Sequence, residues 1–208
     1  MTTGRPALDA LLAHPDIARL ARALEGTPGK PVEPEPHLQW AAIALTLRLG
    51  DDGHPELLMI KRADAAGDPW SGHVACPGGR MDPGDADLTQ TAIRETREEI
   101  GVNLARVGRI LGTLDDLSPR TPYLPPIVIR PFVVAVPSAL AIEASSEVAS
   151  WFWVPLAALR EPDAWSTSTI HVRGVARQER TFVYREHVVW GLTERVLTQL
   201  LAQLSLTR

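Results

Sequence analysis

Three glutamates crowd one short stretch of the chain. Glu95, Glu98 and Glu99 stand three and four residues apart, and residues at these spacings are neighbours on a helix. At 100° per residue the three carboxylates lie within roughly a 100° arc. Like charges this close cost an isolated helix about 0.2–0.5 kcal/mol per pair, whereas a hard divalent cation with oxygen ligands would reverse that cost. The spacing therefore fits a metal site, or a solvated helix face in which Arg94 pairs with Glu98.

A helix must hold these carboxylates, and the flanking residues mark its ends. Asp85 or Asp87 can cap the start, and Gly101 can end the helix. On the side opposite the glutamates, a core face is expected at three positions spaced by seven residues: Ala86, Ile93 and Ile100. A glycine pair, Gly78-Gly79, precedes the helix and lets backbone approach a ligand closely.

The rest of the chain divides into an arm and a larger domain. Residues 1–37 are expected to form a helical arm, interrupted at Pro15 and followed by a proline-rich linker over 27–36, which packs on the domain or on a partner subunit. Residues 38–208 form the domain proper. A hairpin is expected over 40–49 and 56–62, with strands over 73–76, 106–115, 127–136 and 151–154. A late hairpin over 170–174 and 177–184 precedes a final helix over 188–204. This alternation predicts an α/β fold with helices packed on a mixed sheet.

Composition excludes several classes of function. The net charge of −4 over 208 residues argues against a general binder of nucleic acid or of acidic membranes. No stretch approaches the roughly 20 apolar residues of a membrane span, and the N-terminus lacks an export signal. The single cysteine, Cys76, rules out an internal disulfide and fits a reducing compartment. A cytoplasmic enzyme is therefore expected.

The glycine pair and the glutamate helix together resemble the signature of the Nudix hydrolases, G-x5-E-x7-R-E-U-x-E-E-x-G-U, where U is bulky and apolar. Gly79 opens the match, and Arg94-Glu95-Thr96-Arg97-Glu98-Glu99-Ile100-Gly101-Val102 closes it. Asp85 replaces the first glutamate, one extra residue precedes Arg94, and Thr96 stands at an apolar position. The aspartate and the extra residue resemble the coenzyme A pyrophosphatase-like subgroup of the family.

This resemblance implies a Nudix-type α/β/α sandwich with a mixed sheet, to which the helical arm is added. It also implies a Mg²⁺ or Mn²⁺ cofactor held by Glu95, Glu98 and Glu99 with the backbone carbonyl of Gly79. Glu98 and Glu99 are then catalytic, and Gly78 and Gly79 lie against the substrate. Metal ions suit the cleavage of a phosphoanhydride because they neutralise phosphate oxygens and acidify a bound water.

The sequence does not decide which carboxylate activates the attacking water. In the Nudix family this general base is either a glutamate of the signature helix or a carboxylate outside the signature. Glu147 is the preferred outside candidate, because it precedes a Trp151–Leu156 strand in the manner usual for Nudix proteins. Asp115, Asp116 and Glu143 are further candidates, and a surface carboxylate without a role is the alternative for each. The resemblance gives Asp85 and Arg94 a structural role, orienting the loop and the helix.

The segment before the signature bears on the substrate. Coenzyme A-type members carry L-L-T-x-R-S-x3-R-x3-G-x3-F-P-G-G, and this chain matches that frame at Arg62, Gly72 and the closing Pro77-Gly78-Gly79. The second arginine is absent, Cys76 replaces phenylalanine, and Asp68-Pro69-Trp70 fills the gap. The subgroup is thus indicated, while the substrate is left open.

Two residues of this segment are candidate substrate contacts. Arg62 suits multi-donor binding of a phosphate, although a surface salt bridge is an equal alternative. Trp70 can stack on a nucleobase or serve as a lid over the core. Cys76, in a strand beside the site, is expected to be a small buried hydrophobe rather than a nucleophile.

Three functions remain. The leading one is a metal-dependent pyrophosphohydrolase that cleaves the diphosphate of a nucleoside diphosphate linked to another moiety. Its first candidate substrate is coenzyme A or acyl-CoA, cleaved to 3',5'-ADP and phosphopantetheine. The second keeps this chemistry with ADP-ribose, a dinucleoside polyphosphate or a nucleoside triphosphate. The third is a non-catalytic nucleotide-binding Nudix module. The expected partner is a nucleotide-containing small molecule, with a homodimer also possible.

Overall fold

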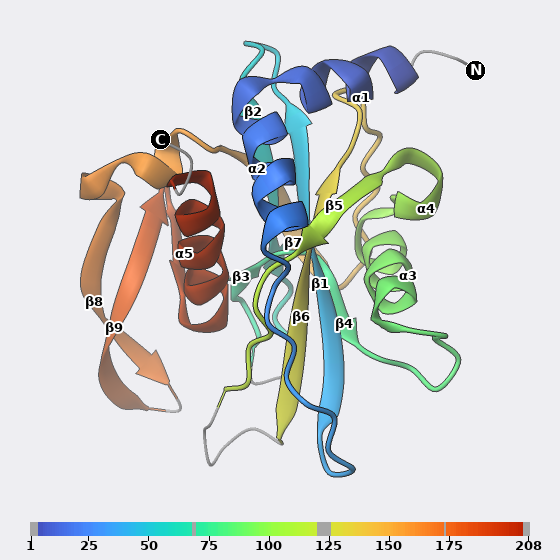
Figure 1. Cartoon of the computed structure of the whole chain (residues 1–208). Coiled ribbons are helices and arrows are strands. Elements are labelled where there is room, and N and C mark those ends of the chain that lie inside the picture. The colour runs from blue at the N-terminus through green and yellow to red at the C-terminus, as the bar shows by residue number, and fades with distance from the viewer. Residues whose placement is uncertain (1–3, 68–69, 120–125, 173, 206–208) are drawn as a thin grey trace.

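A mixed sheet lies at the centre of the protein in a computed structural model that describes residues 4–67, 70–119, 126–172 and 174–205 (Figure 1). The central strand β1 (Gln39–Leu49) pairs in parallel with β6 (Ile127–Ala135) and antiparallel with β2 (Pro55–Arg62). The strand order is β3-β2-β1-β6-β5, with β4 paired to β1 and β7 to β2. The shorter strands are β3 (Val74–Ala75), β4 (Gly78–Arg80), β5 (Arg109–Thr113) and β7 (Val148–Pro155).

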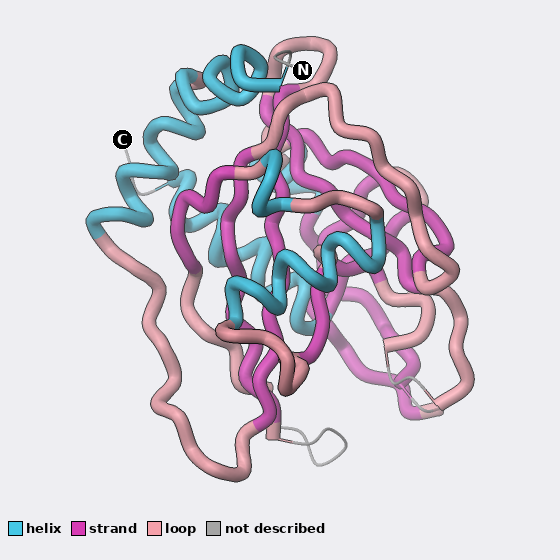
Figure 2. The backbone as a smooth tube through the Cα atoms, turned by 90° about the vertical axis from the view of Figure 1, so that its right-hand side faces the viewer, coloured by secondary structure: helices cyan, strands magenta, loops and turns pink. Residues whose placement is uncertain are grey.

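Helices cover both faces of this sheet, as expected of an α/β/α sandwich (Figures 1 and 2). One face packs against α3 (Leu88–Ile100) and α4 (Leu104–Val107). The other face packs against α1 (Gly4–Ala13), α2 (Pro15–Gly26) and α5 (Gly191–Ser205). The expected mixed-sheet α/β fold is confirmed.

Side-chain alternation in β1 explains the two layers. Ala42 and Ala44 belong to the apolar cluster under α3, whereas Leu45 and Leu47 belong to the cluster under the other helices. Successive side chains of a strand point to opposite faces, so a strand covered on both faces reads as a continuous apolar run.

The helical arm packs on the domain, which confirms one of the two expectations for it. Leu11, Ile17 and Leu20 are fully buried in the same cluster as Leu200 of α5. The break at Pro15 is also confirmed. His14 caps α2 with its side chain accepting from the Asp16 amide, and Pro15 occupies the first turn, where its missing N–H costs nothing.

The linker between α2 and β1, residues 27–38, is held by hydrogen bonds to the end of β5 and the loop after it. The amide of Gly29 donates to the carbonyl of Thr113 at 3.2 Å, and the amide of Lys30 donates to the carboxylate of Asp115 at 2.8 Å. The amide of Val32 donates to the Asp116 carboxylate at 2.9 Å. These contacts fix the course of an extended segment that has no secondary structure of its own.

A second, three-stranded antiparallel sheet follows the main one. It consists of β8 (Trp165–Val172), β9 (Val175–Tyr184) and β10 (His187–Trp190). Figure 1 shows β8 and β9 projecting beyond α5. The expected late hairpin is therefore confirmed, and β8 begins earlier than the sequence indicates.

Several expected element boundaries are wrong; β7, for example, begins at Val148 rather than Trp151. The final helix begins at Gly191 rather than Val188, because Val188 and its neighbours pair with β9; β-branched residues suit such a strand. The strand expected from residue 106 begins only at Arg109, because Asn103 caps the short helix α4 that runs to Val107. Among the described residues, no helix is long and apolar enough to cross a membrane.

Candidate active site

Two glycines bring the backbone of β4 into close contact with its surroundings. Gly78 has φ 151°, and a Cβ there would lie 2.2 Å from the carbonyl oxygen of Ala42. A Cβ at Gly79 would lie 2.5 Å from the carboxyl carbon of Glu95. A side chain at Gly78 would force the backbone of β1 to shift, whereas a side chain at Gly79 would displace the carboxylate of Glu95. The glycines thus allow the turn to pack against β1 on one side and the glutamate helix on the other.

The helix α3 begins at Leu88 because Asp87 is its cap, with the side chain accepting from the amide of Gln90 at 2.9 Å. Gly101 ends the helix with φ 74°, a left-handed conformation that favours glycine. The expected core position Ala86 is wrong, because it lies before this start and is exposed.

Thr96, at an apolar position of the family signature, is fully buried in α3. Its hydroxyl donates to the carbonyl of Ala92 at 2.6 Å, one turn earlier. This bond satisfies the hydroxyl within the helix, so threonine can replace an apolar residue here without leaving a buried polar group unpaired.

The three glutamates differ sharply in exposure. The side chain of Glu99 is 3% exposed and accepts from the amide of Gly78 at 2.8 Å. Glu95 is 17% exposed and Glu98 is 52% exposed. The carboxylates therefore become steadily more exposed from Glu99, which contacts Gly78, through Glu95 to Glu98.

Arg94 ties the signature loop to the helix. Its guanidinium donates to both carboxylate oxygens of Asp85 at 2.9 and 2.8 Å, and to the carbonyl of Arg80 at 2.9 Å. It also donates to Glu95 at 2.9 Å and to Glu98 at 3.0 Å. The paired guanidinium holds the pKa of Asp85 well below its usual range. These contacts agree with the orienting role that the resemblance implies for both residues.

Two of the glutamates carry negative charge that their surroundings disfavour. Burial raises the pKa of Glu99 to about 7, and the charges of Glu95 and Glu147 add to the increase, against the Gly78 amide and Arg62. Burial also raises the pKa of Glu95, with Glu98 and Glu147 adding to the rise and Arg94 opposing it. Desolvation and neighbouring like charges both penalise ionisation, so these carboxylates would be stabilised by a cation.

The donor set fits a hard divalent cation in its chemistry. It offers carboxylate oxygens beside a side-chain-free backbone turn, and such cations prefer oxygen ligands. Within the described part of the chain, however, no three acidic, histidine or cysteine side chains already converge around a common point. Arg94 contacts Glu95 and Glu98, while Glu99 is bound to the turn. Ion binding would therefore require these side chains to turn toward one another.

The carboxylates considered outside the signature separate into two groups. Glu147 is exposed, its carbonyl accepts from the amide of Ala63 at 2.8 Å, and its charge acts on Glu95 and Glu99. Asp115 and Asp116, in contrast, hold the linker.

Glu143 packs beside the end of α3, where its amide donates to the carbonyl of Ile100 at 3.0 Å. Among the four outside candidates, Glu147 is the one whose charge raises the pKa of Glu95 and Glu99.

Arg62 lies at the end of β2 and faces the same carboxylates, with a guanidinium nitrogen 3.6 Å from Glu99. Arg62 is thus paired with a buried carboxylate of the site, rather than in the surface salt bridge considered as the alternative. Trp70 is half-buried, and its carbonyl accepts from the amide of His73 at 3.1 Å. Base stacking by Trp70 stays a prediction. Asp68 and Pro69 lie outside the described residues.

One aromatic contact beside this segment was not anticipated. The centroid of the His73 ring lies 4.5 Å from the ring centroid of Trp190, the last residue of β10. The contact itself depends on the packing of β10 against β3, which no local pattern encodes.

Cys76 is 3% exposed, and burial raises the pKa of its thiol to about 12, with Glu99 adding to the increase. A thiol that stays protonated is a poor nucleophile. The expectation of a small buried hydrophobe is confirmed.

Comparison with known proteins agrees with this geometry. Residues 37–172 match the sequence model of the NUDIX domain family. The chain is 36% identical over 155 residues to the uncharacterized Nudix hydrolase NudL of Photorhabdus laumondii, covering 72% of this chain and 77% of that protein. It is 33% identical to the protein of the same name from Yersinia pestis, covering 73% of this chain and 74% of that protein.

A solved structure supports the same fold. The NUDIX hydrolase from Alicyclobacillus acidocaldarius superposes with a TM-score of 0.52 at 20% identity, covering 79% of this chain and 91% of that one. The extent of the family match and the identity to these relatives show that the chain belongs to the Nudix hydrolase family.

Proposed function

We propose that the protein is a metal-dependent pyrophosphohydrolase that cleaves the diphosphate of a nucleoside diphosphate linked to another moiety. The first candidate substrate is coenzyme A or an acyl derivative, with 3',5'-ADP and phosphopantetheine as products. The observation that carries the proposal is the buried carboxylate of Glu99, beside Glu95 and against the glycine turn, in an environment that disfavours its charge.

The metal ligands in this proposal are Glu95, Glu98 and Glu99 with the backbone carbonyl of Gly79. A bound Mg²⁺ or Mn²⁺ would supply charge neutralisation at the phosphates and an acidified water. The requirement for a cation is supported by the raised pKa values of Glu95 and Glu99.

The remaining site residues act on the substrate directly. Arg62 is assigned to a phosphate, since its guanidinium already faces the carboxylates and arginine suits multi-donor binding. Trp70 is assigned to the nucleobase. Glu147 is assigned to take the proton from the attacking water, because it is exposed and close enough for its charge to act on the helix glutamates.

The choice of coenzyme A depends on sequence. Asp85, the extra residue before Arg94 and the frame from Arg62 to Gly79 support it. The missing second arginine favours a second candidate, in which the same chemistry acts on ADP-ribose, a dinucleoside polyphosphate or a nucleoside triphosphate. A non-catalytic binding module is a third candidate, although such a module would not need all three glutamates.

Substitution of the glutamates tests the chemistry. Glu98→Gln and Glu99→Gln are each expected to abolish the Mg²⁺-dependent release of 3',5'-ADP from coenzyme A, measured by chromatography. Glu161→Gln, at an exposed position away from the signature, is the matched control and should retain full activity. Full activity in the Glu99 variant would remove the metal assignment.

A substrate panel at fixed Mn²⁺ separates the candidate functions. The ratios of kcat/KM for coenzyme A, ADP-ribose, a dinucleoside polyphosphate and a nucleoside triphosphate rank the substrates. Coenzyme A is expected to have the highest value. An absence of turnover across the panel, together with tight ligand binding by calorimetry, would instead support the binding module.

A further inference from the structure

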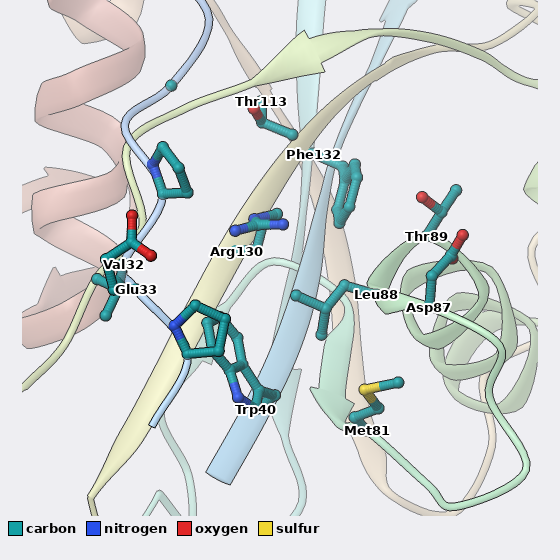
Figure 3. A pocket seen from close by; sticks show the side chains of 13 residues that line it. Val32, Glu33, Trp40, Met81, Asp87, Leu88, Thr89, Thr113, Arg130 and Phe132 are labelled. Carbon is teal, nitrogen blue, oxygen red and sulfur yellow. The ribbon is translucent and has the colours of Figure 1, made fainter. Parts of the chain in front are cut away.

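A cavity of about 710 Å³ opens at the N-terminal end of α3, between that helix, the linker and the sheet (Figure 3). Trp40 of β1 and Phe132 of β6 lie on the sheet side, and Leu88 lies on the helix side. Met81, 37% exposed, closes the lower edge. The lining is therefore mainly apolar, and a ligand that buries methyl and methylene groups would be stabilised there.

The charges around the cavity select against an anion. Of the described residues that line it, Arg130 alone is basic. Its guanidinium donates to both oxygens of the Asp116 carboxylate, at 2.8 and 2.7 Å, so its charge is already matched. Glu33 and Asp87 add two carboxylates to the lining. A phosphate would meet net negative charge, whereas a neutral chain would not.

The cavity lies close to the glutamates without including them. Met81 follows Gly79 by two residues, so their Cα atoms are at most about 7 Å apart. Leu88 and Glu95 are seven residues apart on α3, which is about 10 Å along its axis. A ligand whose diphosphate lies at the glutamates needs a connecting chain of only this length to reach the cavity.

We propose that this cavity receives the neutral arm of the substrate: a flexible, amide-containing, partly apolar chain of the pantetheine type. The inference depends on the hydrolase function proposed above. A chain with two amide units extends over roughly 13 Å, as four extended residues do, which is enough to span the gap.

Both halves of such a substrate then have a matched environment. Thr89 and Thr113, which are neutral polar residues of the lining, are assigned to the amides, and Trp40 and Phe132 are assigned to the aliphatic groups. The anionic nucleotide half stays on the other side of the glutamates, near Arg62.

Filling the cavity tests this inference. Thr89→Trp and Met81→Trp each place a large ring in it, and both positions are at least partly exposed, so the fold should tolerate them. Binding of 4'-phosphopantetheine in the presence of Mg²⁺ is expected to weaken about tenfold, the loss given by roughly two methylene groups left unburied. Thr167→Trp, on the exposed strand β8, is the matched control and should bind as the wild type does. Calorimetry measures this without any bond being cleaved.

Turnover gives the second readout. In both filling variants the KM for coenzyme A should rise about tenfold, while kcat/KM for ADP-ribose, which lacks the arm, should stay within about twofold of wild type. Undetectable binding of phosphopantetheine to the wild type, or equal binding to the filled variants, would overturn the inference. Cleavage of coenzyme A with unchanged KM in the filled variants would overturn it while leaving the hydrolase function intact. The enzyme could also cleave other diphosphates but not coenzyme A, while phosphopantetheine binding is lost in the filled variants. That result would support the cavity as the binding site of the arm and would reject coenzyme A as the substrate.

Discussion

Two carboxylates of this protein are almost equally buried and are used in opposite ways. The side chain of Asp116 is 1% exposed and that of Glu99 is 3% exposed. Asp116 receives two guanidinium hydrogen bonds from Arg130 and a third bond from the Val32 amide. Glu99 has one amide at hydrogen-bond distance, an arginine nitrogen at 3.6 Å, and other carboxylates nearby.

The difference lies in whether the protein itself matches the buried charge. Asp116 is matched by neighbours on the sheet and the linker, and it holds those elements together. Burial raises the pKa of Glu99 to about 7, because the Gly78 amide and Arg62 only partly offset the loss of solvation and the neighbouring carboxylates add to it. A buried carboxylate therefore indicates a ligand site only when its own protein leaves the charge without sufficient partners.

The largest expected effect is on activity at the partly matched carboxylate. Glu99→Gln should lower kcat/KM on the order of a thousandfold, since a metal ion contributes several kcal/mol of transition-state stabilisation and each 1.36 kcal/mol is tenfold in rate. Its melting temperature without metal should be equal to or above that of wild type, because a disfavoured charge is removed. Mg²⁺ should raise the melting temperature of the wild type only. A clear loss of metal-free stability in the variant would contradict the comparison.

The converse effect is expected at the matched carboxylate. Asp116→Asn leaves Arg130 without its anionic partner, and breaking a buried pair costs about 3–5 kcal/mol. Arg130 is 27% exposed, so we expect a loss in the free energy of unfolding near 2–3 kcal/mol, at or below that range. Urea denaturation measures this loss. Activity per folded molecule should be largely retained. A loss of activity as large as that of the Glu99 variant would show that Asp116, too, acts in the reaction.

A second matched carboxylate, Asp85, sharpens the comparison through pH. Pairing with Arg94 lowers its pKa in the folded state, so it stabilises the fold above its unfolded pKa of about 3.9. That contribution is lost as the pH falls below this value. Asp85→Asn should reduce the free energy of unfolding by about 1–2 kcal/mol at pH 7, and the difference from wild type should shrink on acidification. Denaturant titrations at several pH values compare the two proteins. A difference that does not depend on pH would show that the charge is not its source.

The smallest effect is expected at Cys76, which precedes Gly78 by two residues and is close enough to Glu99 for that charge to act on its thiol. Its raised pKa and burial predict that iodoacetamide labels the folded protein far more slowly than the unfolded protein at pH 8. Mass spectrometry of the labelled protein measures the two rates. Rapid labelling of the folded protein would show that the segment around Cys76 opens to solvent.

Much of the fold and the centre of the site can be predicted from local patterns. The glycine turn, the glutamate spacing and the Gly101 stop are contained within residues 78–101, so short-range rules locate them. The hairpin of β1 and β2 likewise joins neighbouring segments. The exposures of the three glutamates, in contrast, depend on packing against β4 and were not predictable.

The misplaced helix start and the misjudged carboxylate have different causes. Val188 follows a helical pattern in sequence, yet pairing with Val183 makes it part of a strand. Asp116 was a candidate base on sequence grounds, and only its contacts with Val32 and Arg130 identify it as structural. The cavity at the start of α3 combines the linker with two strands and a helix, so it has no signature in any one segment.

The way the first two helices close over the sheet has a practical consequence. The family match begins at residue 37, and truncation there would appear to yield a minimal enzyme. Such a truncation would remove Leu11, Ile17 and Leu20 from the cluster they share with α5, and it would strip the Val32 amide from Asp116. The shortened protein would present bare aliphatic surface to water and would tend to aggregate. Trimmed expression variants of this chain should therefore keep its first 37 residues.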